Sequence, residues 1–211
     1  MSKYFEKLES LRGLAAIAVV LYHSPFFPVD NRFEFVSNSY LFVDFFFVLS
    51  GFVMTSAYAD RISQGFSFRD YAILRLGRIY PLHFALLCAW IFFVFFKWIL
   101  YSNRLEFIDP LKYNTVEALL SNLMLFHSLN VINYNSWNFP SWSISVEFAA
   151  YIIFFAFIFL TRKRFTLLLA LTVSIGSYLY LFQSSGWTTM DFTVINGIFR
   201  CCGGFFAGVA L

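Results

Sequence analysis

Long apolar blocks alternate with short polar links along the whole chain. The blocks cover residues 11–24, 39–58, 71–100, 142–160, 165–182 and 192–211, and most approach the roughly 20 residues that one bilayer crossing needs. Their apolar residues are continuous instead of alternating with polar ones, which favours helices over barrel strands. The pattern predicts an all-α, polytopic membrane helix bundle with about six spans.

A seventh block, residues 116–132, is shorter and more polar, so it could be a full span or a re-entrant helix. If it does not cross, ten Lys and Arg residues face the cytoplasm and four face outward, leaving aside Arg200 inside the last block; a full crossing makes the split seven to seven. The ten are Lys3, Lys7, Arg12, Arg61, Arg69, Arg75, Arg78, Arg162, Lys163 and Arg164. The positive-inside rule therefore favours a short or re-entrant helix and a cytoplasmic N-terminus.

Composition agrees with an integral membrane protein. Hydrophobic residues make up 60% of the chain and charged residues only 13%, too few to coat a soluble globule. The net charge of +3 is small, and nucleic acid is not indicated as a partner. Cys88, Cys201 and Cys202 lie in apolar blocks without metal-ligand spacing, so we interpret them as packing residues and expect no metal site.

The first block carries an arginine and a histidine. Arg12 and His23 are 11 residues apart, almost three helical turns, so they share one helix face about 16 Å apart along the axis. An ionisable side chain inside a span indicates a functional site, although a core histidine or a signal peptide is the alternative. No A-x-A-like cleavage site follows, so we expect a retained first span.

Further ionisable residues lie in the next two blocks. Asp44 either faces a partner inside the bundle or sits near the outer end of its span. Arg75 and Arg78 are neighbours on one helix face. Such a pair suits a phosphate or carboxylate at the membrane surface, but it is also typical of a positive-inside anchor.

The block that begins at Trp142 adds an acidic residue, Glu147, with Ser143 on the same helix face. Trp137 and Trp142 before this span are expected to be interface aromatics. With Arg200, these ionisable residues predict a polar cavity in which a histidine could act as a general base. A proton-coupled transporter would use the same residue types.

Four motifs together resemble the membrane-bound acyltransferase family 3. They are LRGLAAIAVVLYH with Arg12 and His23, VDFFFVLSGFVM at 43–54, RLGRIYP with Arg75 and Arg78, and WSISVEFAAY at 142–151. The resemblance implies transfer of an acyl group, usually acetyl from cytoplasmic acetyl-CoA, to a carbohydrate hydroxyl at the outer face of a bacterial inner membrane. The acceptor would be a polysaccharide or lipopolysaccharide of the cell envelope.

Carried over by residue, the resemblance makes His23 the catalytic histidine, Arg12 its motif partner and Glu147 an acidic residue that lines the acceptor side or orients His23. Arg75 and Arg78 would contact the CoA donor. Asp44, Trp142 and Ser143 are further candidates for substrate binding. Acyl-CoA is then a substrate, with no bound cofactor, and His23 acts either as a general base or through a covalent acyl-histidine.

The family implies roughly ten spans, which need well over 211 residues. We therefore expect residues 1–211 to be the N-terminal part of a single transmembrane domain whose C-terminal spans are missing. An inactive truncated remnant, or a membrane subunit that binds a partner, is the main alternative to an active enzyme.

Overall fold

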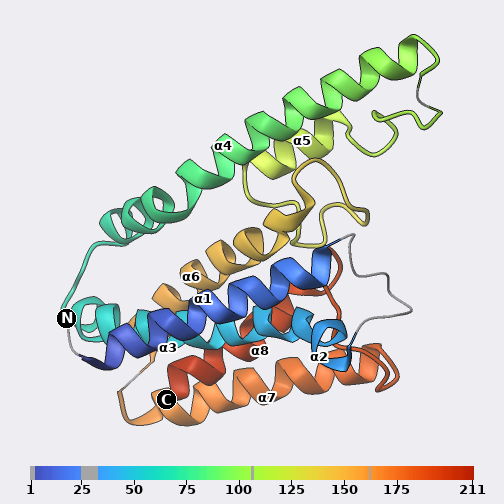
Figure 1. Ribbon diagram of the computed structural model, residues 1–211. Helices are drawn as coiled ribbons and strands as arrows, with labels where there is room; N and C mark the ends of the chain where they lie inside the picture. Colours follow the sequence, from blue (N-terminus) through green and yellow to red (C-terminus); the bar gives the residue numbers. More distant parts are fainter. Residues whose placement is uncertain (1–2, 25–32, 106, 162) are drawn as a thin grey trace.

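The computed structural model describes residues 3–24, 33–105, 107–161 and 163–211, and in these ranges the chain is a helical bundle (Figure 1). The longer helices are α1 (Lys3–His23), α3 (Phe42–Ser63), α4 (Phe68–Ser102), α6 (Trp142–Leu160), α7 (Thr166–Ser184) and α8 (Gly197–Ala210). Short helices α2 (Glu34–Ser37), α5 (Val116–Leu123), η2 (Ser39–Leu41), η3 (Phe139–Ser141) and η4 (Lys163–Phe165) connect them. The all-α fold class expected from the apolar blocks is confirmed.

Four segments are long and apolar enough to cross a membrane: Ser39–Ser63, Phe68–Ser102, Phe139–Leu160 and Lys163–Ser184. The other two expected spans correspond to shorter apolar helices, Ser10–His23 and Gly197–Ala210. Block 116–132 forms only α5, about 12 Å long, which is too short for a crossing. Hydrogen bonds from His83 and Tyr80 to backbone carbonyls near the end of α5 hold this helix along α4.

Helix α8 is the centre of the bundle and packs against α3, α6 and α7. Ten of its 14 residues are buried, including Arg200 and the adjacent pair Cys201 and Cys202. Glycines bring α8 very close to α3. A Cβ added at Gly51 would overlap the carbonyl of Phe205, and one at Gly208 would overlap the carbonyl of Val48. Small residues without a Cβ thus allow the two backbones to lie in contact.

Helices α1 and α4 flank this central block. Helix α1 contacts α2, η2 and α3, whereas α4 contacts α6 through its first half and extends away from the bundle beyond it (Figure 1). Trp142, expected at the membrane interface, is instead 7% exposed and packs its ring edge against Phe47 in the core. Its position at the start of α6, directly over α8 and α3, explains the difference.

Candidate active site

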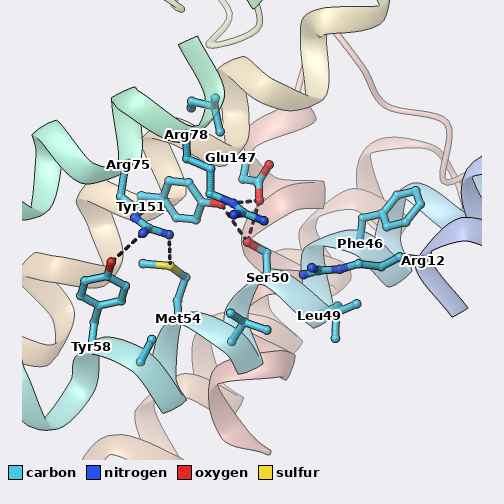
Figure 2. Close-up of a pocket in the computed structure, with 13 residues that line it drawn as sticks. Arg12, Phe46, Leu49, Ser50, Met54, Tyr58, Arg75, Arg78, Glu147 and Tyr151 are labelled. Carbon is cyan, nitrogen blue, oxygen red and sulfur yellow. Dashed lines mark hydrogen bonds between the residues drawn. The ribbon is translucent and has the colours of Figure 1, made fainter. Parts of the chain in front are cut away.

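A cavity of about 540 Å³ lies among α1, α3, α4 and α6 (Figure 2). Arg12 from α1 lines it together with Arg75 and Arg78 from α4, although more than 60 residues separate Arg12 from Arg75 in sequence. We call this the arginine cavity. The structure therefore brings together the three arginines that the motifs had singled out.

The arginines of this cavity have few internal partners. Arg75 donates to the Tyr58 hydroxyl at 2.6 Å and to the Met54 sulfur at 3.4 Å, and its Nε is buried without a partner. Within the described ranges, no carboxylate lies within 4.0 Å of the guanidinium of Arg12, Arg75 or Arg78. Three cations that share a cavity without an ion pair to any of them suit an anionic ligand with several oxygens.

His23 lies in a neighbouring, mostly apolar cavity of about 740 Å³, which we call the histidine cavity. Its Nδ1 is 2.9 Å from the carbonyl oxygen of Val19. Because a carbonyl oxygen can only accept, Nδ1 carries the proton of the neutral ring and Nε2 keeps a lone pair. In the described part of the chain, no carboxylate lies within 4.0 Å of His23, so the backbone fixes its tautomer without the acidic neighbour that the sequence had suggested.

The two cavities meet at Glu147 and Phe46, which line both of them. Glu147 Oε1 accepts hydrogen bonds from the hydroxyls of Ser50 and Tyr151, each at 2.6 Å (Figure 2). Ser143 lines the histidine cavity one turn before Glu147, as the spacing of these two residues on one helix predicts, and Trp142 lines it as well. The three arginines and His23 thus line separate but adjacent cavities.

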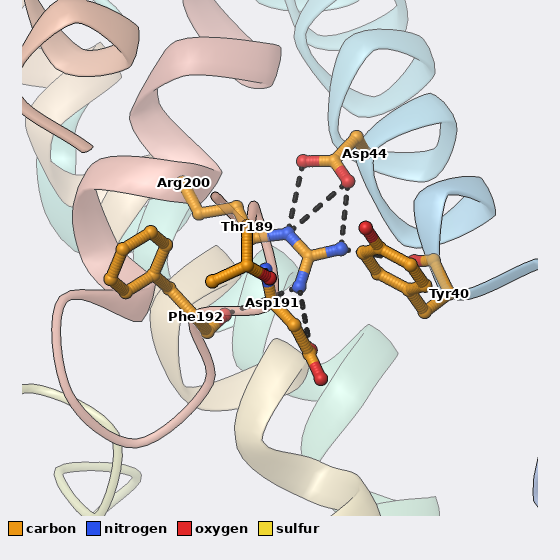
Figure 3. A network of polar contacts seen from close by, with 6 residues as sticks. All are labelled: Tyr40, Asp44, Thr189, Asp191, Phe192 and Arg200. Carbon is orange, nitrogen blue, oxygen red and sulfur yellow. Dashed lines mark hydrogen bonds and ion pairs between the residues drawn. The ribbon is translucent and has the colours of Figure 1, made fainter. Parts of the chain in front are cut away.

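Asp44 is placed elsewhere. Its two carboxylate oxygens receive hydrogen bonds from Nε and Nη2 of Arg200 at 2.8–3.2 Å (Figure 3), and Asp44 lines neither the arginine cavity nor the histidine cavity. Arg200 is 1% exposed and also reaches Asp191 and the backbone carbonyls of Tyr40 and Phe192. Of the two interpretations left open for Asp44, the structure favours the carboxylate that faces a partner inside the bundle. The expectation that Asp44 helps to bind a substrate finds no support in this placement.

Several residues of the arginine cavity were not predicted as site residues, although Ser50, Met54 and Tyr151 lie within the quoted motifs. Ser50, Met54 and Tyr58 follow one another at intervals of four on α3, so they form one stripe that faces the cavity. Tyr151 stands four residues after Glu147 on α6. In both cases the signal was present in the spacing, since residues four apart share a helix face.

A second polar cluster lies between α4 and the turn after α5. The His83 and His127 rings stack in parallel with centroids 6.0 Å apart, and His127 Nε2 is 3.1 Å from the Ser141 hydroxyl just before α6. His127 lies outside the four candidate spans and is 4% exposed. Burial, assisted by the neighbouring His83, lowers the pKa of His127 to about 4, so this ring stays neutral.

Comparison with known proteins identifies the family. The family model for an acyltransferase domain matches residues 5–211. The chain belongs to acyltransferase family 3. Among curated relatives of this family 3 chain, YrhL of Bacillus subtilis (strain 168), provisionally named a peptidoglycan O-acetyltransferase, is 30% identical over 163 residues, which are 72% of this chain and 23% of that protein.

Two further relatives carry related names. The peptidoglycan O-acetyltransferase OatA of Listeria monocytogenes is 29% identical over 82% of this chain and 28% of its own length. The O-acetyltransferase OatA of Staphylococcus aureus (strain NCTC 8325 / PS 47) is 26% identical over 82% of this chain and 29% of its own length. The family 3 chain thus spans about a quarter of the length of these relatives. No solved structure matches it.

Proposed function

We propose that the chain moves an acyl group from a CoA thioester held in the arginine cavity to a hydroxyl of a cell-surface carbohydrate that reaches the histidine cavity. The observation that carries this proposal is the adjacency of the two cavities at Glu147 and Phe46. The phosphates of CoA are too polar for the bilayer interior and pair well with guanidinium groups. The donor would then enter from the cytoplasmic side of the inner membrane, where the N-terminus also lies.

The tautomer of His23 supports its role in the reaction. With Nδ1–H donating to Val19, the Nε2 lone pair can take the proton of the acceptor hydroxyl as its oxygen attacks the thioester carbonyl. The carbon–sulfur bond then breaks, and the CoA thiolate leaves and takes up a proton. The same lone pair could instead attack the thioester and form an acyl-imidazole before the acceptor arrives.

The identity of the acyl group and the acceptor follows the names of the relatives. Two of them are named for O-acetylation of peptidoglycan and a third for O-acetylation alone. We therefore propose acetyl as the acyl group and a peptidoglycan sugar hydroxyl ahead of a lipopolysaccharide as the acceptor.

The deciding experiment follows acetyl-CoA turnover by the purified chain in nanodiscs, with peptidoglycan fragments as acceptor. The His23→Ala variant should lose about 100- to 10,000-fold in rate, because a general base contributes that much. Leu14→Ala is the matched control, since Leu14 lies on the same helix and is exposed away from both cavities. Full turnover in His23→Ala, or no CoA binding by the parent chain, would contradict the proposal.

The two chemical routes separate in the absence of acceptor. Acetyl-CoA alone should leave an acetyl group on His23 if the acyl-histidine forms, and mass spectrometry of the acid-quenched protein would detect it. An unmodified His23 in a chain that turns over with acceptor would assign the general-base route.

A further inference from the structure

The hydroxyls around Glu147 form an unusual arrangement. Ser50 from α3 and Tyr151 from α6 both donate to Oε1 at 2.6 Å, and the two hydroxyl oxygens are 3.1 Å apart. Each hydroxyl has a single hydrogen and donates it to the same carboxylate oxygen, so neither hydroxyl donates to the other. In the described part of the chain, no hydrogen bond ends on Oε2, which points away from both hydroxyls in Figure 2.

Both donors belong to the rigid centre of the bundle. Ser50 is 7% exposed and precedes Gly51, whose backbone touches α8. Tyr151 is 4% exposed, packs against the Phe205 ring, and its backbone carbonyl accepts the Tyr71 hydroxyl at 2.9 Å. The position of Oε1 is therefore fixed from two helices.

The fixed position of the Glu147 carboxylate affects the positive charge of the arginine cavity. Arg12, Arg75 and Arg78 line the same cavity as Glu147, yet none of them lies within 4.0 Å of its carboxylate. A glutamate that could swing freely would pair with one of these guanidiniums and cancel part of the positive charge available to a ligand. Ser50 and Tyr151 line the arginine cavity but not the histidine cavity.

We propose that Ser50 and Tyr151 are positioning residues that hold Glu147 off the arginines, so that the guanidiniums stay open to the donor and Oε2 stays open to the acceptor hydroxyl. This inference rests on the proposed function, because it assigns the arginine cavity to an anionic donor. It adds two residues to the site, each acting through Glu147 and not by contact with CoA.

The test measures binding of CoA itself, so that it does not depend on turnover. The Kd of CoA is compared among the parent chain, the Ser50→Ala/Tyr151→Phe double variant, Glu147→Gln, and the triple variant in nanodiscs. The double variant should bind CoA about tenfold more weakly, because the released carboxylate pairs with the arginines. In the Glu147→Gln background the same two substitutions should have no effect, because a neutral amide cannot form the competing ion pair.

The controls separate this inference from the proposed function. Ser56→Ala/Tyr101→Phe changes the same residue types at exposed positions of α3 and α4 and should leave the Kd of CoA unchanged. A double variant that binds CoA as the parent does would overturn the inference alone. The same holds if the two substitutions weaken binding equally in both backgrounds, as a general structural loss would. A parent chain that binds no CoA would instead overturn the proposed function.

Discussion

Arg200 and Arg75 are both partly or fully buried arginines in one bundle, but they differ in how completely their N–H donors are hydrogen-bonded. Arg200 is surrounded by two carboxylates and two backbone carbonyls (Figure 3). The centroids of the Tyr40 and Trp142 rings lie 5.5 and 5.4 Å from its guanidinium carbon. Arg75 also lies near two rings, those of Tyr58 and Tyr151. Its hydrogen bonds, however, go to a tyrosine hydroxyl and a thioether sulfur, and one of its nitrogens is buried without a partner. A cation whose donors are all taken stabilises the fold, whereas one left incomplete marks a place for a ligand.

The largest effect is expected on stability, at Arg200, whose N–H donors are all hydrogen-bonded. Arg200→Ala should lower the free energy of unfolding by about 3–5 kcal/mol, because it leaves Asp44 buried without its counter-charge. Thermal unfolding in nanodiscs measures the loss. Arg200→Ala combined with Asp44→Ala should recover part of the stability, since the orphaned charge is gone; equal instability of the single and double variants would show that the pair is not the cause.

His127 is a third kind of buried ionisable group. It stays neutral instead of pairing with an opposite charge. Its pKa is about 4 in the folded chain against about 6.5 when unfolded. Between these values the unfolded chain binds more protons, so stability is complete above pH 6.5 and falls as the pH drops towards 4, by about 3 kcal/mol at most. Melting temperatures across this range should fall less steeply in His127→Asn than in the parent; identical slopes would contradict the assignment.

Substitution of Arg75, whose hydrogen bonding is incomplete, should affect CoA binding and not folding. Arg75→Ala should weaken CoA binding about 10- to 100-fold, the loss expected for hydrogen bonds to a charged group, while the melting temperature changes little. Titration of CoA into the purified chain measures this. Arg69→Ala is the control, because Arg69 is exposed near the start of the same helix and does not line the cavity. A large loss of stability with unchanged CoA affinity would place Arg75 in the same class as Arg200.

The smallest effect is expected at an exposed ion pair. Lys163 lies 3.5 Å from Asp60, but their side chains are 94% and 82% exposed. Water and salt screen such a pair, so Lys163→Ala should move the melting temperature by no more than about 1 °C and leave CoA binding unchanged. A change in melting temperature as large as that of Arg200→Ala would contradict the expectation that buried, fully hydrogen-bonded charges stabilise the fold more than exposed ones.

Local spacing explains what could be predicted from the sequence. The helix that carries Arg12 and His23, the pairing of Arg75 with Arg78 on one face, and the shared face of Ser143 and Glu147 all follow from the 3.6-residue period. These relations need no knowledge of the partner helices. The apolar blocks likewise predicted the helical class, and the blocks 71–100, 142–160 and 165–182 match α4, α6 and α7 within about three residues at each end, because length and hydropathy are local properties.

The contacts between distant segments could not be predicted in this way. Asp44 and Arg200 are 156 residues apart, and no periodicity indicates that α8 inserts its arginine beside α3. The burial of Trp142 could not be predicted for the same reason, because a tryptophan at a helix start resembles an interface residue until the helices that cover it are known. The hydroxyl pair on Glu147 combines one local relation, Tyr151, with one distant relation, Ser50.

The glycine contact between α3 and α8 also decides which wall of the two cavities can adjust to a substrate. Parting these helices would separate two backbones that already touch at Gly51 and Gly208, so Ser50 and the Glu147 carboxylate behave as a stationary surface. Helix α1 is held by α2, η2 and α3 at the side of this block. A tilt of α1 would carry Arg12 and His23 together. The Arg12 side of the arginine cavity and the His23 side of the histidine cavity would then move together past a fixed surface.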